Sequence, residues 1–395
     1  MTTLGRPAAD FLLPPDHALH RVRRVALTAA AVGVLASALG AWQSPVQFYR
    51  SYLVAYLFWL GLALGSLAIL MINHITGGAW GAVIRRLLES AARTMPLLAL
   101  LFIPIALGMQ ELYEWARPEA VAHDPVLQHK SLYLNVPFFL ARAVVYFLAW
   151  STVAYFLGRW SLLQDGRRDE RPAIWLEQLS RGGLLLLGLT ATFASVDWMM
   201  SLEPHWFSTI YGFLFMGGCV LGALAFAISM ASAIADRPPL SEVITPATLQ
   251  DLGKLLFAFV MLWAYFSLSQ FLIIWAADLP EEIPWYLRRL HGGWRMMILG
   301  VIAVQFILPF VLLLSRRVKR SARALAVVAS LVLLARFADL YWLVAPAFDA
   351  TAPRIHLLDV TTLLAVGGVW IAAFVALLEK QPLVPLADPS LAEVP

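Results

Sequence analysis

Residues 194–212 read ASVDWMMSLEPHWFSTIYG and place three ionisable side chains, Asp197, Glu203 and His205, within nine residues. Carboxylates and imidazoles accept and release protons, so such a cluster could carry general acid–base chemistry or a proton relay. The stretch directly before it, RGGLLLLGLTATF, is apolar enough to lie in a membrane. Because ionisable side chains are costly in that setting, their presence needs a functional or structural reason.

Each of the three side chains also has a simpler structural interpretation. Asp197 could be a hydrogen-bonded cap, but no basic residue lies within a helical turn of it, and His205 is its nearest neighbour of opposite charge in sequence. Glu203 precedes Pro204, a pair that suits a turn or the start of a helix. His205 lies beside Trp206, as an interfacial residue would. The pattern favours function for Asp197 and a turn for Glu203, and leaves His205 open.

Other ionisable residues inside apolar stretches are expected on the same side of the membrane as Asp197, with Arg336 nearer mid-depth. A charge at the bilayer centre costs roughly 2.5–3.5 kcal/mol. Arg336 and Asp339 are three residues apart on one helix face and are predicted to form a structural ion pair, with Arg142 in a similar role. The residues expected to line an outer polar cavity and proton path are Asp197, His205, Glu203, Glu111, Asp359 and His356.

The inner half of the predicted membrane domain offers fewer such groups. His74 and Lys254 lie at the ends of apolar stretches, where they can reach the membrane surface. His74, Ser267 and Gln270 are the candidates for an inner polar path, although hydroxyl and amide groups more often form hydrogen bonds between helices. The sequence therefore predicts an outer half-channel rather than a continuous one.

The composition sets the class of protein. The chain of 395 residues is 61% hydrophobic and 14% charged, so its exterior must face mainly lipid. Its single cysteine, Cys219, excludes an internal disulfide, a cysteine-ligated iron–sulfur cluster and a C-x-x-C-H haem attachment within this chain. None of the eight histidines lies in the middle of an apolar stretch, which argues against a membrane haem b. Neither a metal site nor a bound cofactor is predicted for the chain itself.

Ten apolar stretches have the length needed to cross a bilayer. They lie near 25–41, 51–73, 95–112, 136–157, 182–201, 209–234, 254–277, 294–315, 324–346 and 357–378. The first resembles a signal peptide, because arginines precede a short apolar run, but the region before that run is long, and we interpret the stretch as a retained anchor. The sequence thus predicts an all-α protein with a segment 1–24, a ten-span domain 25–380 and a Pro-rich tail 381–395.

Basic residues predict the orientation. With both termini in the cytoplasm, the inner segments hold 20 of the 29 lysines and arginines and the outer segments hold 7. This excess predicts an N-in, C-in topology, with the first segment and the tail cytoplasmic. The basic loops 80–94 and 164–181 have tryptophan and leucine on one face and arginine on the other, which predicts short interfacial helices.

Four stretches carry a resemblance to a known family. They are SVDWMMSLEPHWFSTIYG (195–212), GKLLFAFVMLWAYFSLSQFLIIWAADLPEEIPWYLRR (253–289), NHITGGAW (73–80) and FADLYWLVAP (337–346). In this order they resemble the ActF subunits of bacterial alternative complex III, a quinol oxidoreductase whose membrane subunits are related to that of polysulfide reductase. The chain departs from the family at Ala276 and Asp278, where tyrosine and asparagine are more usual.

The resemblance implies two four-helix bundles with two extra spans, in a bacterial cytoplasmic (inner) membrane. It also implies partners: a homologous sister membrane subunit, an iron–sulfur protein, haem c subunits and small membrane subunits. The haem c and iron–sulfur clusters would belong to those partners, whereas quinone or quinol is a candidate ligand of this chain. No nucleic-acid partner is expected, whereas membrane lipid is expected to contact the chain.

Two other classes stay open. A structural scaffold of the same complex would need no ionisable group at Asp197, whereas a proton path predicts that Asp197→Asn lowers quinol oxidation or its proton coupling without preventing assembly. A secondary transporter would show broken helices at matching positions of two repeats, and Pro104 and Pro309 are candidates for kinks. We further expect Asp197 to face the bundle interior, and Arg336 to pair with Asp339 or with Asp359.

Overall fold

The computed structural model describes residues 11–14, 17–166, 171–235 and 240–386. These residues contain helices and no β-strand, and ten of the helices are long and apolar enough to cross a membrane. The ten are Ala18–Gln43, Pro45–Thr76, Ala79–Leu107, Val136–Asp165, Arg171–Leu202, Tyr211–Ile234, Pro246–Ala277, Gly292–Leu314, Ala322–Ala347 and Leu357–Leu378. The protein is therefore a multi-pass membrane protein, as the sequence predicts.

Several of these spans are divided into shorter helices. In chain order the helices used below are α1 (Ala18–Gln43), α2 (Pro45–Thr76), α3 (Ala79–Ala92), α4 (Met95–Leu101), α5 (Ile103–Leu107), α6 (Met109–Leu112), α7 (Pro118–His123), α8 (Pro125–Lys130), α9 (Val136–Gly166), α10 (Arg171–Trp198), α11 (Tyr211–Ile234), α12 (Pro246–Ala277), α13 (Ile283–Arg289), α14 (Gly292–Val301), α15 (Leu308–Leu314), α16 (Arg316–Arg320), α17 (Ala322–Val344) and α18 (Leu357–Leu378).

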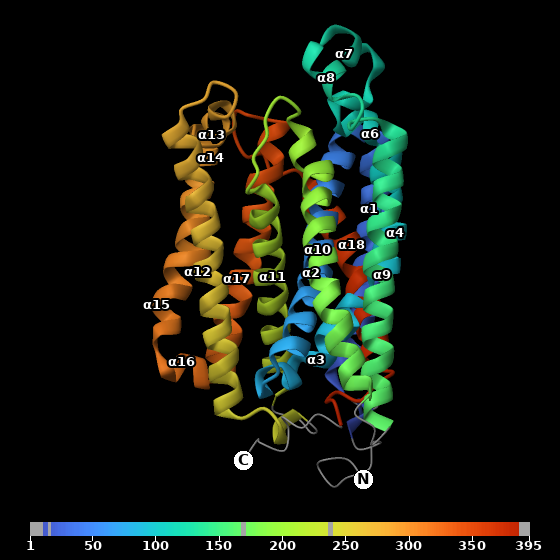
Figure 1. The fold of residues 1–395 in the computed structure, drawn as a ribbon, viewed down its shortest axis with the longest axis vertical. Helices are drawn as coiled ribbons and strands as arrows, with labels where there is room; N and C mark the ends of the chain where they lie inside the picture. The colour runs from blue at the N-terminus through green and yellow to red at the C-terminus, as the bar shows by residue number, and fades with distance from the viewer. Residues whose placement is uncertain (1–10, 15–16, 167–170, 236–239, 387–395) are drawn as a thin grey trace.

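The helices form two groups of four spans and an additional pair. α2, the α3–α6 span, α9 and α10 pack together, and α11, α12, the α14–α15 span and α17 form the second group. α1 packs along α18, and both contact α2 (Figure 1). α1 begins and α18 ends at one end of the molecule, the terminal end, and α7, α8 and α13 lie at the opposite, distal end (Figure 1). The N-in orientation stays a prediction.

Small residues bring α1 and α18 into close contact. A side chain at Gly33 would place its Cβ 2.5 Å from the backbone nitrogen of Ala365, and one at Gly368 would place it 2.5 Å from the carbonyl oxygen of Ala26. Such small residues let backbones approach in a setting where lipid is as apolar as any side chain. The first apolar stretch is thus bound along its length to the last one.

The middle of the molecule is formed by α2 and α11. α2 is apolar on all sides and is buried on nearly all of them, as expected for a central helix. At Gly65 a Cβ would lie 2.0 Å from the carbonyl oxygen of Cys219 on α11, so glycine is required at this crossing. The thiol of Cys219 is buried in the same contact.

Two spans are interrupted near the predicted prolines. Pro104 follows the break between α4 and α5, and Pro309 follows a π-helical turn over Ile302–Ile307. Proline has no N–H for the preceding turn, so the helix must adjust before it. Both helices continue beyond the interruption, and the prolines therefore produce kinks rather than full breaks.

Two predictions about the loops were wrong. Residues 80–94 do not form an interfacial helix, because α3 is buried among α2, α9 and α11 and begins the third span. Residues 171–181 belong to the continuous helix α10, and residues 160–165 belong to α9. The arginine-rich face of residues 80–94 that suggested a membrane surface is instead used for buried ion pairs. Residues 167–170, part of the predicted loop helix, lie outside the described residues.

Of the predicted tail, residues 381–395, the structure describes residues 381–386. Residues 381–386 are not helical, yet most of them are buried against the terminal end of the bundle. Leu383, Val384 and Leu386 are each at most 3% exposed. This part of the chain is a packed strap, and residues 387–395 lie outside the described residues.

Candidate functional site

Asp197 lies in the last turn of α10 and is completely buried. Arg142 of α9 contacts both of its carboxylate oxygens, with Nε–Oδ2 and Nη2–Oδ1 distances of 2.9 and 2.8 Å. The hydroxyl of Tyr146 donates a further hydrogen bond of 2.8 Å to Oδ2. Asp197 therefore faces the bundle interior, and this prediction is confirmed.

No basic residue lies within a helical turn of Asp197, and its partner comes from a different helix. Arg142 precedes it by 55 residues and reaches it because α9 and α10 are antiparallel neighbours. Arg142 also donates 3.0 Å to the carbonyl oxygen of Tyr133, and its guanidinium lies 3.9 Å from the centre of the Tyr133 ring. A bidentate arginine occupies both oxygens of a carboxylate. This geometry suits a pair that fixes the position of two helices better than one that exchanges protons freely.

One sequence signal could have identified the partner. Arg142 and Tyr146 are four residues apart and so project from the same face of one helix. A cation and a hydroxyl on one face of an apolar helix indicate a buried acid opposite them. The expected assignment of Arg142 to a structural ion pair agrees with this geometry.

Glu203 connects the turn after α10 to α13. It lies directly after a short 3-10 helix, and its oxygens are 3.0 Å from Arg288 and 2.6 Å from Arg289. Arg289 is 1% exposed and also donates to the carbonyl oxygens of Trp285 and Leu343. Glu203 thus is a turn residue, as expected, and in addition links two distal segments through the buried Arg289.

His205, whose role the sequence leaves open, contacts the residue that caps α8. Its Nε2 lies 2.7 Å from Asp124, which caps α8, and its side chain is 55% exposed. Partial burial opposes ionisation of Asp124, but hydrogen bonds from the backbone N–H groups of Val126 and Leu127, together with His205, lower the pKa of its carboxyl. His205 is therefore not a partner of Asp197.

Arg336 and Asp339 form the predicted ion pair on α17. Asp339 also accepts hydrogen bonds from Trp263 Nε1 at 2.9 Å and Gln305 Nε2 at 3.2 Å, so three elements converge on it. Gln305 lies in the π-helical turn, a feature that is frequent at functional sites. On α11 a Cβ at Gly218 would lie only 2.3 Å from the guanidinium carbon of Arg336.

Asp359 and His356 form the capping box of α18. Asp359 accepts a hydrogen bond from the backbone N–H of His356 at 2.8 Å and another from the hydroxyl of Ser51. The side-chain nitrogen Nδ1 of His356 accepts from the N–H of Leu358. These observations assign the i, i+3 spacing of His356 and Asp359 to a helix cap rather than to a direct side-chain pair.

A cavity of about 370 Å³ opens beside Asp359 at the distal end, and Asp359, His356, Arg50, Tyr341, Phe348 and Asp349 are among its lining residues. Hydrogen bonds from the side chain and backbone of Thr351 lower the pKa of Asp349 at the cavity rim. A cavity thus lies at the distal end, but of the six residues expected to line the outer cavity only Asp359 and His356 line this one. Glu111 lies on α6 with an exposed side chain.

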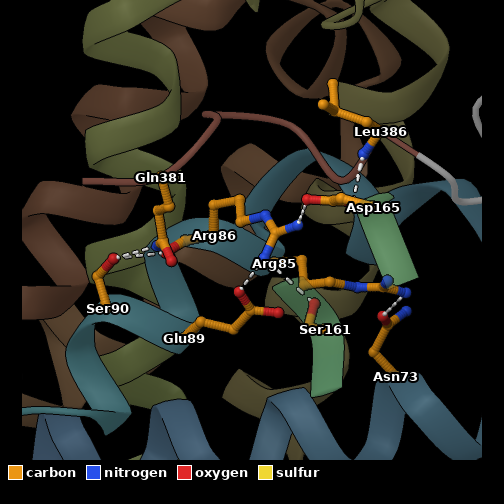
Figure 2. A network of polar contacts seen from close by, with 9 residues as sticks. All are labelled: Asn73, Arg85, Arg86, Glu89, Ser90, Ser161, Asp165, Gln381 and Leu386. Carbon is orange, nitrogen blue, oxygen red and sulfur yellow. Dashed lines mark hydrogen bonds and ion pairs between the residues drawn. The ribbon is translucent and has the colours of Figure 1, made fainter. Parts of the chain in front are cut away.

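A buried ionic cluster that was not predicted from the sequence lies at the terminal end (Figure 2). Arg86 on α3 is 0% exposed and donates to Glu89 at 2.6 Å and to Ser161 at 3.2 Å, and it also pairs with Asp165. The side-chain amide of Gln381 donates to Ser90 Oγ at 2.7 Å. The sequence was expected to place few buried ionisable groups in this half, and this cluster was not foreseen because α3 is buried in the bundle rather than lying on a membrane surface.

The predicted inner polar path separates into two places. His74 lies near the terminal end of α2, where its Nδ1 is 3.2 Å from Ser180 Oγ. Ser267 and Gln270 follow Trp263 along α12 toward α13, so they lie on the distal side with Asp339. Ser267 and Gln270 therefore do not continue a polar path from His74. Whether any of these residues conducts protons stays a prediction.

The described residues contain no group of three or more histidine, cysteine, aspartate or glutamate side chains that could hold a metal ion. No protein-family model matches the chain, and a search of curated proteins gives no match either.

Proposed function

We propose that this chain is the membrane subunit of a quinol oxidoreductase complex that passes electrons to cytochrome c or an equivalent acceptor. In this role it carries no redox centre and provides a proton path at its distal end. The observation that carries the proposal is the set of three buried carboxylates, Asp197, Asp339 and Asp359, at or toward the distal ends of the spans. Quinol oxidation releases two protons, and these need acceptors within hydrogen-bond reach or along a water chain.

The three carboxylates differ in the groups that donate hydrogen bonds to them, and this difference ranks them as candidate proton acceptors. Asp197 and Asp339 are each paired with a buried arginine. The hydrogen bonds that Asp359 accepts come from neutral donors, Ser51 and the backbone of His356. A carboxylate without a bound cation can take up a proton without leaving a buried charge unpaired. Asp359 beside the cavity is therefore the better proton acceptor, in place of Asp197.

The family resemblance supplies the proposed assembly. The partners would be a homologous sister membrane subunit, an iron–sulfur protein, haem c subunits and small membrane subunits in a bacterial cytoplasmic membrane. The distal end, where α7 and α8 project beyond the spans, is the surface proposed to meet the redox subunits (Figure 1). A quinone or quinol headgroup would approach the cavity near Asp359.

Purified complex carrying Asp359→Asn tests the proposal. We expect quinol-dependent reduction of the acceptor, or proton release per electron in liposomes, to fall at least about tenfold, since one well-placed proton acceptor typically contributes a factor of about 10²–10⁴. Asp251→Asn is the matched control, because Asp251 is an exposed acid of α12 that pairs with Lys254 outside the cavity. Normal turnover and an unchanged proton-to-electron ratio would contradict the proposal.

A structural scaffold is the second candidate, and the two arginine-bound carboxylates favour it. Buried ion pairs of this kind can fix helix positions without any chemical role. A transporter is not favoured, because the kinked spans are the second span of one group and the third of the other. The kinks at Pro104 and Pro309 therefore do not occupy matching positions.

A further inference from the structure

The strap formed by residues 381–386 closes the terminal end of the first helix group. Just before it, Glu379 pairs with His20 and Arg23 of α1. Within it, the N–H of Leu383 donates 2.8 Å to the carbonyl oxygen of Phe11, and the N–H of Leu386 donates 2.8 Å to Asp165 Oδ1. A non-helical segment is thus held by a few separate contacts with the N-terminal segment and α9.

The strap lies directly over the ionic cluster around Arg86 (Figure 2). Gln381 donates to the carbonyl oxygen of Arg86 at 3.2 Å and to Ser90, and Leu386 contacts the same carboxylate that Arg86 does. Asp165 therefore joins the strap to the cluster, with one oxygen on each. Any movement of the strap changes the surroundings of this buried charge network.

Three polar atoms of the strap and the cluster below it have no hydrogen-bond partner in the described chain. They are Glu89 Oε1, Arg86 Nε and Gln381 Oε1, and the three residues that carry them are at most 1% exposed. Buried polar groups are normally satisfied by protein or by ordered water, and a buried water typically makes two to four hydrogen bonds. Two acceptors and one donor in a single charged cluster provide the partners that such water requires.

We propose that the strap is a lid over a buried water-binding site formed by Arg86, Glu89 and Gln381. With the strap closed, the site holds ordered water that is isolated from the aqueous phase at the terminal end. With the strap open, that phase reaches Glu89. The role of such a gate in proton movement rests on the proposed function, but the lid itself is independent of it.

The strap is suited to opening as a unit. Pro382 and Pro385 have no N–H groups, so few backbone donors bind it to the rest of the chain. Segments with few backbone hydrogen bonds open at lower free energy than the helices they cover. Leu383 and Val384 supply apolar anchors, and their burial makes the closed position the ground state.

Cysteine accessibility tests the lid. Ser161→Cys, in a Cys219→Ala background, places a thiol in the cluster at a position that is 1% exposed and leaves the hydrogen bonds of the strap intact. A water-soluble, charged thiol reagent is applied at the terminal end of purified full-length protein or complex. Ser195→Cys on α10, also 1% exposed, is the control in the distal half.

Opening of the strap should expose the first thiol and not the second. We expect Val384→Asp, which places a charge at a fully buried strap position, and truncation after Lys380 each to raise Ser161→Cys labelling at least tenfold. Ser195→Cys should stay protected in the same proteins. Unchanged labelling of Ser161→Cys in both strap variants would overturn the lid, as would equally fast labelling with the strap intact.

A second variant decides the matter if strap release unfolds the protein and both thiols react. A disulfide between Phe11→Cys and Leu383→Cys, whose backbones are hydrogen bonded, should hold the strap closed. It should lower the slow labelling of Ser161→Cys, and reduction should restore it; no effect would overturn the proposal. A density map that resolves ordered water should show it at Glu89 Oε1, and an empty position there would overturn the water site.

Discussion

Arg142 holds both carboxylate oxygens of Asp197 across the interface between α9 and α10, at 2.9 and 2.8 Å. The pair is buried, and Tyr146 and the carbonyl oxygen of Tyr133 complete its hydrogen bonds. Taking two charges out of water is costly, and here the cost is offset by bidentate geometry and by additional partners. This ion pair with Arg142 makes Asp197 primarily a structural residue.

Removing one partner of this pair should destabilise the protein more than removing both. We expect Asp197→Ala or Arg142→Ala to lower the free energy of unfolding by about 3–5 kcal/mol, because each leaves an uncompensated buried charge. Thermal and denaturant unfolding in detergent measure this. The double variant should recover part of the loss, and a double-mutant cycle that is simply additive would contradict the pairing.

The close contact between Gly218 and Arg336 gives a packing prediction. Gly218→Ala would place a methyl group 2.3 Å from the guanidinium carbon, and we expect it to cost about 1–3 kcal/mol of stability through overpacking. Gly300→Ala is the matched control, because a Cβ there meets no atom within 4 Å. It should be neutral or stabilise the helix by up to about 1 kcal/mol. Equal melting temperatures for the two variants would refute the contact.

Much of the fold follows from sequence patterns that are local. Each span is an apolar run of sufficient length, and Arg336 and Asp339 pair within one helical turn, so both could be predicted. Arg142 and Asp197 could not be paired in this way, because the sequence does not specify which helix faces pack together. The same limit explains Arg86 and its cluster: a basic, amphipathic segment has the same pattern on a membrane surface as in a buried charged interface.

The residue that caps the C-terminus of α12 gives a prediction about backbone conformation. Asp278 follows that helix in a left-handed conformation with φ 52°, which asparagine and glycine adopt more readily than other residues. An acid at a helix C-terminus is also unfavourable for the helix dipole. We expect Asp278→Asn to raise stability by a few tenths of a kcal/mol and Asp278→Gly by up to about 1 kcal/mol. Asp278→Val should be destabilising, and thermal unfolding distinguishes the three.

Asp124 should make the distal loop sensitive to acid. Its pKa is lowered in the folded protein by backbone hydrogen bonds and His205, so its contribution is present above the unfolded pKa of about 3.9 and is lost as the pH falls through the lower, folded value. Limited proteolysis or hydrogen exchange of residues 114–135 between about pH 5 and pH 2 would detect this. Asp124→Asn should remove this change, whereas Glu119→Gln should retain it, since Glu119 does not cap α8. Identical acid responses in both variants would exclude Asp124 as the cause.

The hydrogen bonds to Asp339 yield the last prediction. Trp263 and Gln305 come from different elements and donate to the same oxygen, Oδ2, that Arg336 contacts. We expect Trp263→Phe and Gln305→Leu each to cost about 1.5–3 kcal/mol, the usual range for a hydrogen bond to a charged group. The double variant should cost more than the sum, because a single remaining cation must then stabilise the buried carboxylate. Asp339→Asn removes the charge. In the Asp339→Asn background, Gln305→Leu should therefore change the free energy of unfolding very little. If Gln305→Leu costs the same in the Asp339→Asn background as with the native acid, Gln305 supports only packing at the π-helical turn.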